Sequence, residues 1–295
     1  MSSQGRTPRP AEFPLTWLDV FTSTPMAGNQ LAVVHDADGV DDATMLAFAR
    51  ETKLSETTFV QSGDDACDYR NRIWMLTGEL PMAGHPSLGT AVAIAHRRGE
   101  RTANYVQRTP AGLQPVTVEL DGRVARSSML QEPAEFHEPL DPERALRAIG
   151  LEPSDAHADL GPEIVSTGVR QALVPLSGLD ALSRARPDPA LVAELLAATG
   201  AITVYAFVPD GARAEARSFF DSPGGLAEED PATGSAAGPL MAYLGRHAGL
   251  EELTISQGVQ MGRPSVLDCA IDGERVRVGG EVVVLSVGTV FLSRS

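Results

Sequence analysis

The sequence is poor in lysine and in long apolar runs, and each shortage excludes a class of protein. Lys53 is the only lysine among the 24 basic residues of the 295-residue chain. A pyridoxal-phosphate enzyme needs a lysine for its Schiff base, so this composition argues against that cofactor. No apolar run approaches the ~20 residues that a membrane-spanning helix requires. We therefore expect no membrane partner.

Basic charge and cysteine are also scarce. The formal net charge is −15, which argues against binding to nucleic acid or to an anionic membrane surface. Cys67 and Cys269 are too few for a disulfide framework, so we expect both to be small buried residues in a reducing, cytoplasmic protein. Residues 1–12 are polar and lack the apolar core of a signal peptide, and they are predicted to form a loose tail.

What the sequence does contain is a long-period internal repeat. Segment 80–89 reads LPMAGHPSLG, segment 230–238 reads DPATGSAAG, and each precedes an apolar segment with helical spacing. An offset of about 150 positions aligns three landmarks, namely Gly84 with Gly234, His85 with Ser235, and Gly99 with Gly249. We interpret this register as an internal duplication. A chance match is the alternative, because Gly/Pro loops before Ala-rich helices are common.

The repeat predicts two similar domains that present a loop and a helix start to a shared cleft. A Pro- and Glu-rich break at 131–139 is the expected crossing between them. A leftover strand, 287–292, is expected to return to the first domain. The predicted N-terminal lobe is therefore 1–130 plus 287–295, and the predicted C-terminal lobe is 131–286.

The predicted helix starts suit the binding of anions. The first amides of a helix are free and lie at the positive end of its dipole, so they bind a carboxylate or a developing oxyanion. Asp230 and Ser235 flank the second start. His85 lies at the first start, where a positive charge is disfavoured, so its imidazole is expected to be neutral and able to exchange a proton.

Glu56 precedes a predicted strand at 57–61, in apolar and hydroxyl-rich surroundings. One interpretation is a solvated surface glutamate. The other is a carboxyl group facing the cleft, with a raised pKa that suits general acid/base catalysis. The residues alone leave both open.

The common cofactor and metal motifs are missing. The sequence has no Gly-x-Gly-x-x-Gly after a strand, no P-loop, no Cys-x-x-Cys and no His-Glu-x-x-His. Its six histidines form no ligand-like cluster, so we expect neither a metal nor a cofactor. Two facing half-sites without a cofactor suggest proton removal beside a carboxylate and proton return elsewhere on the substrate.

Three segments carry a resemblance to a known family. Segments 55–60 (SETTFV), 78–86 (GELPMAGHP) and 229–236 (EDPATGSA) resemble the signature motifs of the phenazine-biosynthesis PhzF-like family. Segment 258–265 (GVQMGRPS) and the opening DVF with Gly28-Asn29 are also similar, so the resemblance spans nearly the whole chain. It implies an α+β diaminopimelate-epimerase-like fold. In that fold two pseudo-symmetric lobes, each a curved, mostly antiparallel sheet wrapped round a central helix, form the active site in the cleft between them.

The resemblance also implies a cofactor-independent isomerase of a small carboxylic acid, and a homodimer. In the phenazine enzyme the substrate is a dihydro-hydroxyanthranilic acid, and a glutamate that matches Glu56 moves a proton between ring carbons. The other implied catalytic residues are His85, Asp230 and Ser235. The predicted substrate-binding residues around the two helix starts are Gly84, Pro86, Ser87, Thr233, Gly234 and Ala236.

Two alternatives to this function remain. Amino-acid epimerases of this plan use a thiol at each helix start, whereas this chain has Met82 or Ala83 at one and Ala232 or Thr233 at the other. An epimerase of amino-acid-like acids is thus disfavoured. A non-catalytic binding or scaffold member is disfavoured by the full set of titratable residues. Substrate identity stays open, because Met82 and Gln30 stand where the family often has Phe and Pro.

Overall fold

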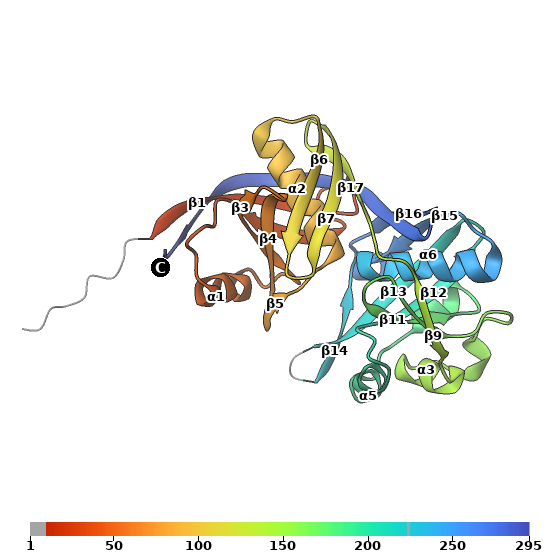
Figure 1. Cartoon of the computed structure of the whole chain (residues 1–295). Coiled ribbons are helices and arrows are strands. Elements are labelled where there is room, and N and C mark those ends of the chain that lie inside the picture. The colour runs from red at the N-terminus through yellow and green to blue at the C-terminus, as the bar shows by residue number, and fades with distance from the viewer. Residues whose placement is uncertain (1–9, 223–224, 295) are drawn as a thin grey trace, which may run out of the picture.

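The computed structural model describes residues 10–222 and 225–294 of the chain. Residues 1–9 of the predicted tail lie outside the described part. The predicted tail also included Ala11 and Glu12. These residues begin strand β1 (Ala11–Val20), so that part of the prediction is wrong. The fold is a mixed α+β structure whose strands form one continuous hydrogen-bonded system. The elements gather into two groups, one around α2 (Gly84–Arg98) and one around α6 (Gly234–Ala248) (Figure 1).

The first group contains the elements before residue 131. In chain order these are β1, β2 (Asn29–Val34), α1 (Asp42–Thr52), β3 (Thr57–Asp64), β4 (Cys67–Met75), β5 (Gly78–Leu80), α2, β6 (Thr102–Thr109), β7 (Gly112–Asp121) and β8 (Val124–Leu130).

The second group contains most of the later elements. In chain order these are β9 (Glu135–Pro139), α3 (Pro142–Ala148), β10 (Glu163–Ser166), β11 (Arg170–Pro175), α4 (Leu179–Arg184), α5 (Pro189–Thr199), β12 (Val204–Asp210), β13 (Arg213–Ser222), β14 (Leu226–Asp230), α6, β15 (Glu252–Gln257) and β16 (Ser265–Asp272). The last strand, β17 (Arg275–Leu292), extends from this group into the first. Among the described residues, none of the helices combines the length and apolar character needed to cross a bilayer.

Strand pairing follows the same order in both groups. The antiparallel pair β1–β2 recurs as β10–β11, and the parallel pair β2–β3 recurs as β11–β12. The parallel pair β4–β6, which flanks α2, recurs as β13–β15 around α6. An internal duplication predicts this repetition.

Helices α2 and α6 are almost completely buried because their surfaces are apolar or small on nearly every side. Both end at a left-handed glycine, Gly99 and Gly249, with φ of 70° and 71°. Small residues let the surrounding strands approach closely. A Cβ on Gly89 of α2 would lie 2.5 Å from Leu31 Cδ2, so the sheet could not curve as tightly around a larger residue.

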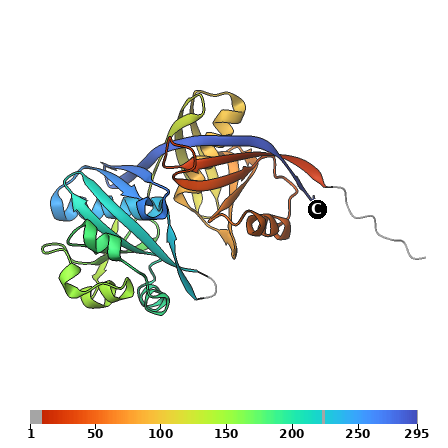
Figure 2. The same cartoon turned by 180° about the vertical axis from the view of Figure 1, so that it is seen from behind.

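Strand β17 joins the two groups. It pairs with β16, then with β8, and from Val282 onward with β1. Figure 2 shows it as the long blue ribbon running from one group across to the other. The sequence predicted a separate strand at 287–292, and this is wrong, because that segment is the end of one continuous strand. Its glycines are strand positions that neighbours crowd, since a Cβ on Gly279 would lie 2.7 Å from Ser127 O. The lobe boundaries at 130 and 287 stay predictions.

Both cysteines are buried and free, as expected from the sequence.

Candidate active site

The starts of α2 and α6 face each other at close range. A Cβ on Gly84 would lie 3.3 Å from the Cα of Gly234, so a side chain there would crowd the start of α6. Neither helix has a conventional side-chain N-cap. Ala83 has no polar group, and Thr233 Oγ1 donates instead to Asp230 Oδ2 at 2.5 Å. The two positive helix ends therefore converge on one region.

Glu56 lies beside this region, in the turn that leads into β3. Its Oε2 is 3.3 Å from His85 Nε2, and the two side chains are 16% and 6% exposed. The contact is not aligned as a hydrogen bond, and neither atom has such a partner within the described chain. The interpretation of Glu56 as a solvated surface residue is therefore wrong.

Burial moves the pKa values of this pair in opposite directions. Burial, helped by the charge of Asp230, raises the pKa of Glu56 to about 8. Burial lowers the pKa of His85 to about 3, so the imidazole is neutral at neutral pH. A neutral imidazole agrees with the prediction, but its main cause is burial rather than the helix dipole.

Asp230 ends β14 and supplies the second carboxyl group. Burial raises its pKa to about 6, while hydrogen bonds from Thr233 Oγ1 and Asn29 Nδ2 act in the opposite direction. Near pH 7 Asp230 is therefore ionised, whereas Glu56 retains its proton. Two carboxyl groups held in different protonation states are typical of acid/base sites.

Ser235 belongs to a neutral hydrogen-bonded chain on the other side of the site. Its Oγ accepts from Gln171 Nε2 at 3.3 Å, and Gln171 Oε1 accepts from Thr203 Oγ1 at 2.6 Å. Ser235 is half-buried, whereas Thr203 and Gln171 are buried. The chain places polar groups that bear no charge beside the start of α6.

The other predicted binding residues lie within the two helix starts. Ser87 Oγ donates to Ala83 O at 2.7 Å, inside the first turn of α2. Pro86 and Ala236 are buried in α2 and α6. The role of these residues in binding stays a prediction.

Asn29 is the residue that the sequence left without a role. It is 2% exposed, and its Nδ2 contacts Asp230 Oδ1, Ala232 O and His85 Nδ1. Gln257 was also missed. Its Nε2 donates to Asp230 O at 2.8 Å and to Thr233 Oγ1 at 3.0 Å, which fixes the loop before α6. The one sequence signal for Asn29 was the Gly28-Asn29 pair, which belongs to the segments that resemble the PhzF-like family.

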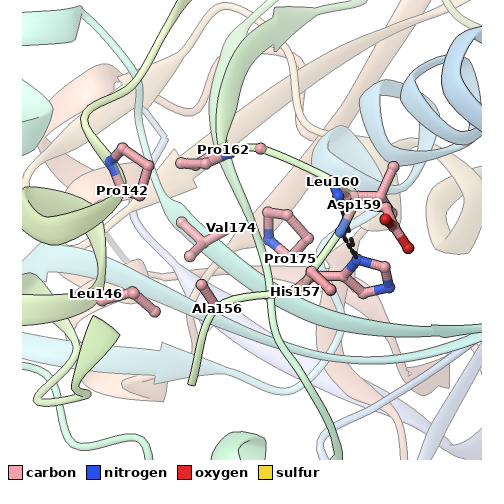
Figure 3. Close-up of a pocket in the computed structure, with 11 residues that line it drawn as sticks. Pro142, Leu146, Ala156, His157, Asp159, Leu160, Pro162, Val174 and Pro175 are labelled. Atoms are coloured by element: carbon pink, nitrogen blue, oxygen red, sulfur yellow. Dashed lines mark hydrogen bonds between the residues drawn. The ribbon is translucent and has the colours of Figure 1, made fainter. Parts of the chain in front are cut away.

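A separate pocket of about 260 Å³ opens away from these residues, against α3 and β11. Pro142, Leu146 and Val174 line it, and at its rim His157 Nδ1 accepts from two backbone amides (Figure 3). None of the predicted site residues lines it.

Solved structures with the same fold set the class of this protein. A PhzF-family phenazine biosynthesis protein from Bacillus anthracis superposes with a TM-score of 0.83 at 26% identity, covering 95% of this chain and 99% of that one. A predicted epimerase from Pseudomonas aeruginosa gives 0.83 at 35% identity, covering 94% and 99%. A hydroxyproline epimerase from Agrobacterium vitis, 12% identical over 95% of this chain and 92% of its own, shares the fold alone with a TM-score of 0.63. The fold is therefore epimerase-like.

Sequence similarity narrows the class to a family. The profile of the family described as phenazine biosynthesis-like protein matches residues 18–288. A trans-2,3-dihydro-3-hydroxyanthranilate isomerase from Pseudomonas fluorescens is 36% identical over 93% of this chain and 98% of its own length. The chain belongs to the phenazine biosynthesis-like family, and it is an isomerase of the PhzF type.

Proposed function

We propose that this isomerase moves a proton, and with it a double bond, within a small carboxylic acid, without a cofactor and with Glu56 as the general acid/base. The observation that carries the proposal is the position of Glu56. Its carboxyl group is largely buried, 3.3 Å from a neutral histidine and beside the facing starts of α2 and α6.

The proposed reaction needs one group that both takes and returns a proton. Ionised Glu56 removes a proton from an activated carbon, and the electron pair spreads through the conjugated system toward the substrate carboxylate. Protonated Glu56 then delivers the proton to another carbon of the same system, so atoms and charge balance. A carboxyl group with a pKa of about 8 is a strong enough base for this step near neutral pH.

The remaining residues would bind and polarise the substrate. The amides at the starts of α2 and α6, together with Ser235, would hold the carboxylate and the charge that develops in the transition state. Burial raises the pKa of Glu56, and the negative charge of Asp230 raises it further. His85 presents a neutral nitrogen to Glu56 rather than a competing positive charge.

The first compound to test is the one named for the similar Pseudomonas enzyme. We propose trans-2,3-dihydro-3-hydroxyanthranilate or a related dienyl acid of specialised metabolism as the substrate class. A homodimer and a cytoplasmic location stay predictions.

The test is incubation with this acid in deuterated water, followed by ultraviolet absorbance and mass. The wild type should consume the acid with a proton shift, and Glu56→Gln should be about 10²–10⁴-fold slower. Glu51→Gln, an exposed change in α1, is the matched control and should retain full activity. Retained turnover in Glu56→Gln would refute the role of Glu56.

Other outcomes separate the alternatives. If the wild type leaves this acid unchanged but converts another dienyl acid, the mechanism stands with a different substrate. If it binds no such acid, the non-catalytic alternative is favoured. Deuterium entering the α position of an amino acid would support an epimerase, although neither Cys67 in β4 nor Cys269 in β16 lies at a helix start.

A further inference from the structure

We propose that Asn29 is a positioning residue for this reaction: its side-chain amide holds Asp230 in place beside His85 and so fixes the charge that faces Glu56. The inference rests on the proposed function. It concerns a residue that would act through its neighbours rather than on the substrate.

The contacts of Asn29 join the two halves of the site. Its Nδ2 lies 2.8 Å from Asp230 Oδ1, 3.0 Å from Ala232 O and 3.3 Å from His85 Nδ1. Because an amide nitrogen carries two hydrogens, the carboxylate and the carbonyl use both, and His85 lies in contact beside them. His85 also hydrogen-bonds the backbone of Gln30, the next residue in β2. One strand start therefore holds the histidine and the aspartate together.

The orientation of the Asn29 amide is fixed from its other side. Ser55 Oγ donates to Asn29 Oδ1 at 3.3 Å, so the oxygen of the amide points to Ser55 and its nitrogen to Asp230. Ser55 directly precedes Glu56. The Asn29 amide thus contacts Ser55, which is next to Glu56 in the chain, and the carboxylate of Asp230.

The backbone that carries Asn29 is held by the second half of the chain. Arg263 Nε donates to Gly28 O at 2.7 Å, and its NH2 group donates to Ala27 O and to the buried Asp19. Gly28 has a φ of 66°, and a Cβ there would lie 2.4 Å from Val20 O, so only glycine fits. The turn before Asn29 cannot easily relax to reposition the amide.

The expected electrostatic effect follows from the groups around Asp230. Hydrogen bonds from Asn29 and Thr233 favour the ionised carboxylate, while burial and the charge of Glu229 disfavour it. Without the Asn29 donor the pKa of Asp230 should rise, and its negative charge near pH 7 should decrease. The pKa of Glu56 should then fall. Besides Glu229 on the same strand, the titratable and charged groups on neighbouring elements are Glu56, His85, Tyr205, Arg217 and Arg263.

A purely structural role for Asn29 is the competing explanation, and the chain offers a matched control for it. Asn71 in β4 is also fully buried, and its Nδ2 donates to Gln107 Oε1 at 3.0 Å. Its hydrogen bond joins two amides and no carboxyl group. Asn71→Leu should therefore lower stability as Asn29→Leu does, without altering the titration of the site.

The experiment is a carbon-13 NMR titration of side-chain carboxyl groups in the labelled full-length protein, assigned with Glu56→Gln and Asp230→Asn. It needs no substrate. In Asn29→Leu the apparent pKa of Asp230 should rise and that of Glu56 should fall, while Asn71→Leu changes neither. On the dienyl acid, the rising limb of kcat/KM for Asn29→Leu should move to lower pH together with the pKa of Glu56, whereas the limb for Asn71→Leu should stay in place.

Unchanged carboxyl titrations in a folded Asn29→Leu protein would overturn the proposal, even if turnover still depends on Glu56. The expected pKa changes in a protein that converts no dienyl acid would support the positioning role and refute the proposed function alone. If Asn29→Leu does not fold, Asn29→Ala, which only deletes atoms, is titrated in its place and judged by the same two outcomes.

Discussion

The two halves of the molecule place different chemistry at equivalent positions of the same framework. His85 occupies the second position of α2, and Ser235 occupies the second position of α6. Glu56 directly precedes β3, and Thr203 directly precedes β12. The pair in the first half titrates, whereas the pair in the second half is linked through the neutral side chain of Gln171. The comparison supports the proposal that Glu56 in the first half transfers the proton, while the uncharged groups around Ser235 in the second half bind the substrate.

A second pair of equivalent positions, Arg72 and Arg217, differs in burial, and here the residue of the second half is the more deeply buried. In each half an arginine lies two residues before an aromatic residue, stacks on its ring, and pairs with a glutamate on the next strand. Arg217 is 6% exposed and also donates to the carbonyls of Leu182 and Ala185, whereas Arg72 is 23% exposed and pairs additionally with exposed Asp42. The hairpin that carries Asp230 is therefore the more firmly held of the two.

The largest expected effect tests this difference in stability. Arg217→Leu leaves Glu229 and two carbonyls without their donor, so the free energy of unfolding should fall by about 3–5 kcal/mol. Arg72→Leu should cost only about 1 kcal/mol, because its partners are more exposed. Urea unfolding of both variants measures the difference. Equal losses would show that the two hairpins are held equally well.

The pH dependence of stability tests the titrating half. The folded-state pKa of Glu56, about 8, lies above its ordinary value of 4.5, so its contribution is complete below pH 4.5 and is lost as pH rises through 8. Between pH 6 and 9 the wild type should lose about 3 kcal/mol more than Glu56→Gln. Thermal unfolding at several pH values follows this loss. Parallel curves for the two proteins would contradict the raised pKa.

Asp230→Asn should move the pH profile of catalysis. The kcat/KM of the wild type should rise with pH, with an apparent pKa of about 8, as Glu56 ionises. Removing the negative charge of Asp230 lowers the pKa of Glu56, so this limb should move to lower pH by roughly one unit, or about 1.4 kcal/mol. A limb that stays in place would show that the charge of Asp230 does not add to the effect of burial on the pKa of Glu56.

Ser235→Ala should have the smallest effect, and it should affect binding rather than titration. Loss of one neutral hydrogen-bonding group in the second half should raise KM about fivefold, equivalent to about 1 kcal/mol. The pH profile should keep its position. A displaced profile would mean that the second half also takes part in proton transfer.

The sequence predicted the parts of the site that depend on local pattern. The loops before α2 and α6 are short, and their glycines, His85 and Ser235 keep register across the repeat. Asn29 could not be found this way, because its partner Asp230 lies 201 positions away and only the fold brings them together. The continuity of β17 was missed for a related reason, since glycines that normally signal turns are here required by close strands. The protonation states of Glu56 and His85 depend on burial, which no local pattern records.

The proposal that Glu56 in the first half transfers the proton, while the second half binds the substrate, has one most direct test. It is the measurement of kcat for two substitutions at equivalent positions, Glu56→Gln and Thr203→Val. Both keep the shape of the side chain. Glu56→Gln removes the titrating carboxyl group, and Thr203→Val removes the hydroxyl that donates to Gln171. Glu56→Gln should reduce kcat on the dienyl acid by about 10²–10⁴-fold, whereas Thr203→Val should reduce it less than about tenfold. Equal losses of kcat in the two variants would contradict the account.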